Sequence, residues 1–79
     1  MSAPVFNQRL ERVIARLYGE QLHATPAAEA LGAVLAVASG FHPYEEARNP
    51  YLPGDANFIP FKQGWQLAVY NRPTLERIA

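Results

Sequence analysis

Residues 25–41, TPAAEALGAVLAVASGF, predict the central helix of the chain. Thr25 has the side chain of an N-cap residue, and Pro26 suits the first helical position, where its missing N–H costs nothing. From residue 30 to residue 38 no side chain is charged or polar, so we expect this helix to be buried on all sides. Ser39 and Gly40 predict its C-terminal end.

Length and composition predict one small domain, residues 1–79, in the cytoplasm. The chain has 79 residues, of which 49% are hydrophobic, enough for a core. It has no cysteine, which excludes disulfides and thiolate metal sites and fits a reducing compartment. The central apolar run is shorter than the roughly 20 residues that cross a bilayer, and arginines interrupt the segment where a secretory signal would lie. We therefore expect no membrane partner.

Residues 3–22 predict an amphipathic helix, with Ser2 as its candidate cap. Its apolar stripe consists of Phe6, Leu10, Val13, Ile14 and Leu17. Arginines recur at i, i+3 and i+7 beside this stripe, as Arg9, Arg12 and Arg16. These arginines form either a contact strip for phosphates or acidic side chains, or a solvated helix face, which is the commoner case.

Residues 42–60 predict an ordered loop, because four prolines stiffen the backbone there. Residues 43–48 are expected to form one or two helical turns, and Asn49-Pro50 is a turn signal. The expected anchors of the loop on the core are Tyr44, Tyr51 and Leu52.

A third helix is expected from about Pro60 to Asn71, with Asn57 or Asp55 at its N-terminus. Its apolar stripe consists of Phe58, Phe61, Trp65 and Ala68. Pro73 should end or kink this helix, and residues 74–79 would add a frayed turn. The predicted fold is thus all-α: a small three-helix domain with a long ordered Pro-rich loop between helices 2 and 3.

Patterns typical of catalysis do not occur in the sequence. Neither serine lies in a nucleophile motif, and the two histidines, His23 and His42, lack the spacing of zinc ligands. Glycine-rich phosphate loops are also absent from the sequence. We therefore expect a protein that is not an enzyme and that uses no cofactor and no metal.

Charge is unevenly distributed along a chain whose formal net charge is +0. Residues 1–23 hold three arginines against two glutamates, whereas residues 24–60 hold one arginine against four acidic side chains. Residues 61–79 hold three basic side chains against one glutamate. Neutral overall charge argues against tight binding of generic nucleic acid, which basic proteins achieve through the phosphates. Glu45 and Glu46 belong to the acidic middle and are expected in a solvated turn.

Aromatic side chains gather around the Pro-rich loop. Such side chains stack on unpaired bases, anchor protein interfaces or fill a core. We expect Phe61 and Trp65 in the core, because the central helix supplies mostly small side chains. For Tyr44 and Tyr51 the core and the binding roles both stay open.

A spaced set of glycines, a turn and an aromatic helix resembles the ribosome modulation factor family, including its small relatives on phages and mobile elements. The residues that carry the resemblance are Gly32, Gly40, Asn49, Pro50, Tyr51, Phe61, Gly64, Trp65 and Ala68. The resemblance covers residues 30–70 and implies that Gly64 lets the third helix approach the central helix, with Trp65 closing the joint. It also implies binding to ribosomal RNA.

The expected function is that of a non-catalytic binding protein. The leading hypothesis is a phage-borne or mobile-element inhibitor of a host ribonucleoprotein machine, such as an anti-CRISPR protein, acting through protein contacts. The alternative is a ribosome-associated RNA-binding factor of the hibernation type. Candidate partner-binding residues are Arg9, Arg12, Arg16, Tyr44, Glu45, Glu46 and Tyr51. Self-association into a homodimer stays open.

Overall fold

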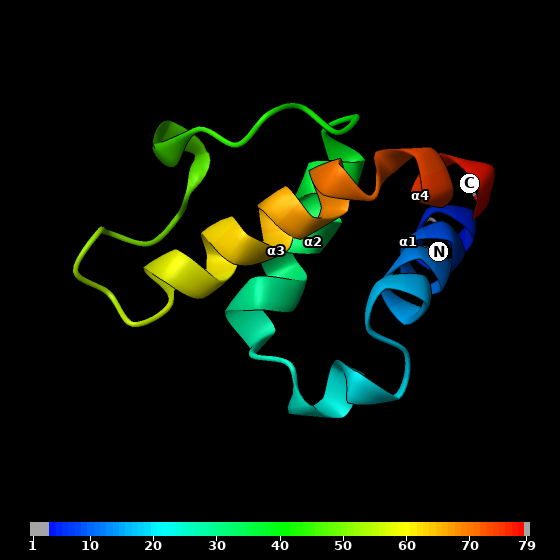
Figure 1. Cartoon of the computed structure of the whole chain (residues 1–79), viewed down its shortest axis with the longest axis horizontal. Helices are drawn as coiled ribbons and strands as arrows, with labels where there is room; N and C mark the ends of the chain where they lie inside the picture. The colour runs from blue at the N-terminus through cyan, green and yellow to red at the C-terminus, as the bar shows by residue number, and fades with distance from the viewer. Residues whose placement is uncertain (1–3, 79) are drawn as a thin grey trace.

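A computed structural model describes residues 4–78, with side chains from residue 10 to residue 77, and it is helical throughout its regular elements (Figure 1). In chain order these are α1 (Pro4–Tyr18), the 3₁₀ helix η1 (Gly19–Ala24), α2 (Ala27–Ala38), the 3₁₀ helix η2 (Glu46–Arg48), α3 (Phe58–Tyr70) and α4 (Arg72–Ile78). Residues 4–78 contain no strand. The all-α prediction is confirmed, with four α-helices in place of three.

The closest approach in the fold is the crossing of α2 and α3, and a glycine on each helix permits it. A β-carbon on Gly32 would overlap the backbone carbonyl of Phe61 in α3. A β-carbon on Gly64 would overlap the backbone carbonyl of Glu29 in α2, whose carbon would lie 2.7 Å away. The two backbones therefore touch at reciprocal positions that no other residue can occupy. The expectation that Gly64 permits a close approach to the central helix is confirmed.

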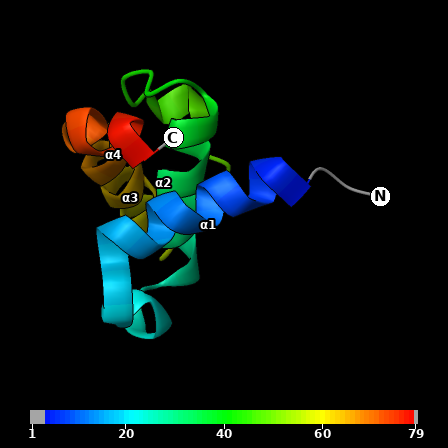
Figure 2. The same ribbon diagram turned by 90° about the vertical axis from the view of Figure 1, so that its right-hand side faces the viewer.

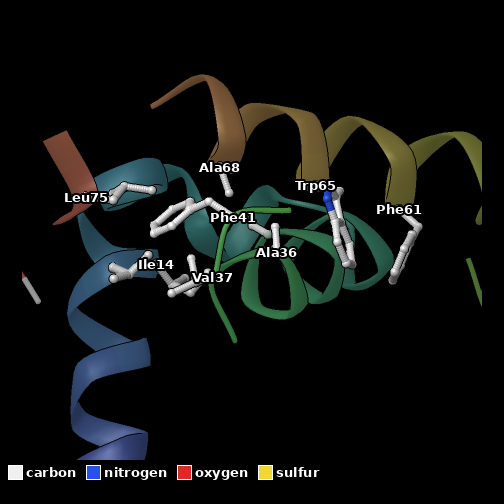
Figure 3. Close-up of a cluster of buried hydrophobic side chains, with 10 residues drawn as sticks. Ile14, Ala36, Val37, Phe41, Phe61, Trp65, Ala68 and Leu75 are labelled. Atoms are coloured by element: carbon white, nitrogen blue, oxygen red, sulfur yellow. The ribbon is translucent and has the colours of Figure 1, made fainter. Parts of the chain in front are cut away.

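Aromatic side chains from α3 and from the end of α2 fill the core beside this crossing (Figure 3). Phe61 and Trp65 are 0% and 3% exposed, which confirms that both belong to the core. Their rings lie 6.0 Å apart between centroids. The indole N–H of Trp65 donates a hydrogen bond of 2.7 Å to the carbonyl of His42, so the one polar atom of that ring is satisfied.

The C-terminal end of α2 reverses the chain through two residues of positive φ. Gly40 has φ 83° and Phe41 has φ 63°, and the Phe41 N–H donates to the carbonyl of Ala36 at 2.8 Å. Positive φ is costly for a bulky residue. Burial of the Phe41 ring, which is 5% exposed, offsets that cost. The predicted helix end at Ser39 and Gly40 is confirmed.

The N-terminal half departs from the sequence predictions at its helix ends. α1 ends at Tyr18 rather than at residue 22, because Gly19 takes φ 55° and the chain continues as η1. Thr25 does not cap α2, since its hydroxyl donates to the carbonyl of Gln21 at 2.9 Å and Pro26 occupies the N-cap position. The candidate cap Ser2 lies outside the described residues, as does the side chain of Phe6.

Asn49 fastens the long loop to α3. Its side-chain amide donates to the Phe58 carbonyl at 3.0 Å and to the Tyr44 hydroxyl at 3.2 Å. Its side-chain oxygen accepts a hydrogen bond of 2.9 Å from the Tyr51 N–H. This one residue therefore bonds both sides of the turn and the first residue of α3 at once.

The two loop tyrosines then pack edge-on against the core aromatics. Tyr44 meets Trp65 with ring centroids 6.4 Å apart, and Tyr51 meets Phe61 at 6.1 Å. Both tyrosines are half-buried, as expected for anchors. Leu52 is 77% exposed, so its prediction as a third anchor is wrong. Leu52 begins a turn in which its carbonyl accepts a hydrogen bond of 2.8 Å from the Asp55 N–H, and such turns lie at the surface.

The C-terminal residues form a packed helix rather than a frayed turn. α3 begins at Phe58, two residues earlier than predicted, and ends at Tyr70 before α4 begins. Leu75 of α4 is 0% exposed and joins the same core cluster as Val13 and Ile14 of α1. Burial of this one leucine stabilises α4, whose isolated length would be too short for a stable helix. α4 in turn gives α1 a second neighbour besides α2.

We predict that Gly32→Ala and Gly64→Ala each lower the free energy of unfolding by about 1–3 kcal/mol, because the added methyl group overlaps a backbone carbonyl that cannot move alone. A loss of that size lowers Tm by at least about 4 °C in a domain of this length. Thermal melts followed by far-UV circular dichroism measure the change. Gly54→Ala is the control, since a β-carbon there would meet nothing within 4 Å. Equal losses in all three variants would contradict the role of the crossing.

We also predict that Asn49→Ala lowers the free energy of unfolding by about 1–3 kcal/mol, because the part-buried groups that it bonds lose their partners. Asn57→Ala should change it by less than about 0.5 kcal/mol, since the Asn57 side chain makes no capping bond. Urea unfolding of the two variants beside the parent measures the difference. If the two substitutions cost the same, Asn49 does not hold the loop.

Candidate functional site: an apolar surface between α1 and α2

α2 has one face that the rest of the described chain covers only in part. Leu31 and Leu35, one turn apart on that face, are 38% and 37% exposed. The prediction that the central helix is buried on all sides is therefore wrong. α3 and α1 pack against two of its sides, and no further element among residues 4–78 packs closely on the third.

An open hollow adjoins this face. Its walls are α1, η1 and α2, since α1 crosses α2 and η1 joins one to the other beneath the crossing (Figure 2). Its volume is about 400 Å³, and the lining residues are Leu10, Glu11, Ile14, Leu22 and Val34. Val34 follows Leu31 by three positions on α2, so the wall of the hollow adjoins the leucine face at Leu31.

We call this region, the five lining residues together with Leu31 and Leu35, the α1–α2 surface. Four of its five lining side chains are aliphatic, and Leu22 is itself 40% exposed. Exposed aliphatic side chains that lie together mark interaction sites more often than scattered ones do. The α1–α2 surface is therefore the strongest candidate for contact with another molecule.

The sequence contains a signal for this surface that the apolar run obscures. Along α2 the small residues Ala28, Gly32, Ala33 and Ala36 are buried, whereas the large residues Leu31 and Leu35 are not. Small side chains permit close backbone approach, so they lie where a helix is crossed. The four-residue spacing of Ala28, Gly32 and Ala36, rather than hydrophobicity alone, would have distinguished the packed side of α2 from the side with the exposed leucines.

The predicted arginine strip lies on a different side of α1. Arg12 and Arg16 are both exposed. Each is two positions from Ile14, hence about 200° around the helix from a residue of the hollow. The structure thus places the arginines away from the α1–α2 surface. The side chain of Arg9 lies outside the described residues.

The predicted loop residues divide into packed and exposed ones. Tyr44 and Tyr51 are largely committed to the aromatic contacts and to Asn49, as described above. Glu45 and Glu46 are exposed, and the Glu45 carboxylate lies 3.8 Å from a guanidinium nitrogen of Arg48. The acidic turn therefore faces solvent.

A second open hollow, of about 490 Å³, lies where the loop meets the C-terminal half of α3. The residues that line it are Pro43, Tyr44, Gln66, Val69 and Tyr70. Tyr70 is 85% exposed and stands free of the core. Tyr44 contributes to this hollow while its hydroxyl stays bonded to Asn49. Tyr44 therefore stays partly accessible at this hollow.

The residues that carry the family resemblance serve packing in this fold. Gly32 and Gly64 make the helix crossing, Trp65 closes it, and Asn49 fastens the loop. Pro50 follows Asn49 in the turn and is exposed. The constellation therefore explains the α2–α3 joint and contributes little to the surface.

Two kinds of feature are absent from the described residues. No group of three potential metal ligands among them lies close enough to hold an ion. None of their helices is long and apolar enough to cross a membrane.

No family model, no curated protein and no solved structure matches this chain. The likeness to the ribosome modulation factor family therefore stays a prediction from the sequence.

Tyr18 is the one described residue with a buried side-chain polar atom that makes no hydrogen bond. Its hydroxyl lies at the α1–α2 contact near Glu29. Burial raises the pKa of the Tyr18 phenol above its ordinary value, and the negative charge of Glu29 raises it further. The folded state therefore holds the phenol proton more tightly than the unfolded state does.

We predict two effects of Tyr18→Phe. At pH 7 the free energy of unfolding should change by less than about 1 kcal/mol, because the hydroxyl makes no hydrogen bond of good geometry that the variant would lose. Above the ordinary tyrosine pKa of about 10, the parent should lose stability that the variant keeps, since ionisation is easier in the unfolded chain. Urea unfolding at pH 8 and pH 11 measures the difference in the free energy of unfolding between the variant and the parent. We expect this difference to shift in favour of the variant at pH 11, and a shift in favour of the parent would contradict the burial of this hydroxyl.

Proposed function

We propose that this chain is a non-catalytic binding protein that inhibits or modulates a host ribonucleoprotein machine, such as a CRISPR effector, through protein contacts. The observation that carries the protein-binding part is the α1–α2 surface, an aliphatic face and hollow on a chain of 79 residues. A small domain has few apolar side chains to spare, so leaving leucines uncovered weakens its core. Contact with a partner protein would recover that burial.

The choice of a nucleoprotein machine rests on two supports of a different kind. One is the resemblance of residues 30–70 to small proteins of phages and mobile elements, many of which act as stoichiometric inhibitors. The other is the pair of exposed guanidinium groups, Arg12 and Arg16, one turn apart on α1. These arginines suit acidic side chains on a partner protein as well as phosphates.

Ribosome-associated RNA binding is the second candidate, and the α2–α3 joint favours it. Gly32, Gly64 and Trp65 pack together as the resemblance to the ribosome modulation factor family implies. Against it stands the acidic segment from residue 24 to residue 60, which would repel a phosphate backbone near the loop. Protein contact is therefore the preferred proposal.

The test is capture of a partner from bacterial lysate by the tagged protein and by paired variants. We predict that Leu31→Gln with Leu35→Gln abolishes capture, because both substitutions remove aliphatic contact from the α1–α2 surface. Leu52→Gln with Ile59→Gln is the matched control, since those side chains are 77% and 53% exposed at a distance from that surface. All variants should melt near the parent temperature. Equal capture by both pairs would contradict the proposal.

Nuclease and salt separate the two candidate functions in the same experiment. Protein-mediated capture should survive nuclease treatment and depend weakly on salt. RNA-mediated capture should disappear with nuclease, and its affinity should fall steeply with salt as counterions are released. The second result would replace the protein-partner proposal with the ribosome one.

A further inference from the structure

Glu11 is the feature of the α1–α2 surface that apolar contact alone does not explain. It is the one charged side chain among the five residues that line the hollow. The other four, from α1, η1 and α2, are aliphatic. A carboxylate at the edge of an apolar hollow is a specificity element, because an apolar occupant that leaves it unpaired gains less than one that supplies a cation.

A second acidic side chain near the hollow adds to the negative charge of Glu11. η1, which forms one wall, carries the exposed Glu20. Of the arginines on α1 whose side chains are described, Arg12 and Arg16 each lie about 200° around the helix from Ile14, which lines the hollow. Both acidic side chains are exposed, and neither appears in an ion pair within residues 10–77. The hollow therefore presents aliphatic walls with negative charge at its edge.

The geometry of α2 indicates the shape of the occupant. Leu31 and Leu35 form a ridge along the helix axis at the i, i+4 spacing. A helix laid along such a ridge places its own apolar side chains at i, i+3 or i+4 into the adjoining groove. A helix supplied by a partner would cover the open side of α2 and form a bundle with α1 and α2.

We propose that the α1–α2 surface binds an amphipathic helix of the partner whose apolar stripe is flanked by lysine or arginine. The aliphatic stripe enters the hollow beside Leu22 and Val34, and a flanking cation pairs with Glu11. This inference rests on the proposed function and adds the chemistry of the partner segment to it.

Two synthetic helical peptides test the proposal. They share one leucine stripe and one length, and their flanking positions are all lysine in the first and all glutamate in the second. We expect the lysine peptide to bind the full chain about two- to fivefold more tightly, the range for a solvent-exposed ion pair. Fluorescence anisotropy measures both affinities, and added salt should narrow the preference.

Reversing the charge of Glu11 tests whether this residue causes the preference for the lysine peptide. Glu11→Lys should abolish or invert it, because the cation now meets a like charge at the hollow. Glu45→Lys is the matched control, since it makes the same change of charge on the exposed acidic turn of the loop. The preference should be unchanged in that variant. Circular dichroism melts of both variants check that the fold is retained.

Three results would overturn the inference: equal affinity of both peptides for the parent, a preference that Glu11→Lys leaves intact, and a preference that Glu45→Lys removes as well. If the two peptides bind the parent equally, and the double variant Leu31→Gln with Leu35→Gln weakens both, the α1–α2 surface is still the binding site. Only its preference for a cationic peptide would then be wrong. Absence of binding by both peptides would end the helix proposal, while lysate capture by the same leucine variants still decides the proposed function.

Discussion

Contact between the backbones of α2 and α3 is the constraint on which the rest of this fold depends. The contact exists because Gly32 and Gly64 face the carbonyls of Phe61 and Glu29, where a single methyl group would overlap backbone. Once the two helices touch, α2 contributes little side-chain volume to the joint. Bulk must then come from α3, which explains why the side chains beside the crossing are those of Phe61 and Trp65.

The loop between α2 and α3 is ordered by the same aromatic side chains. Tyr44 and Tyr51 each meet a core ring edge-on, and the Trp65 indole bonds the chain where it leaves α2. Asn49 connects these points through hydrogen bonds of its amide. Proline restricts the chain between them, so less conformational entropy is lost on folding than in a flexible loop of equal length. Several loop residues that the sequence suggested for binding therefore hold the loop against the core.

The open face of α2 follows from the size of the domain. α3 covers one side of α2 and α1 covers a second, and the described chain has no element for the third. Glu11, which lines the adjoining hollow, adds a negative charge to this otherwise aliphatic surface. Leucines that stay partly exposed on a protein of this length favour contact with a partner, and this is why the proposed function is placed on α1 and α2 rather than on the aromatic loop.

The sequence by itself determined three of the four α-helices, α1, α2 and α3, and the residues of the α2–α3 joint. Periodic apolar stripes, the Gly40 helix end and the spacing of Gly64 and Trp65 act within one or two turns, so they can be recognised in the chain alone. Only the tertiary structure decided which side of α2 stays open, that Leu52 is exposed and that Leu75 is buried. Each of these depends on how many neighbours a side chain meets from segments far along the chain. Burying a leucine side chain is favourable, and that can be read from the sequence. Whether it is buried depends on the number and placement of the other helices.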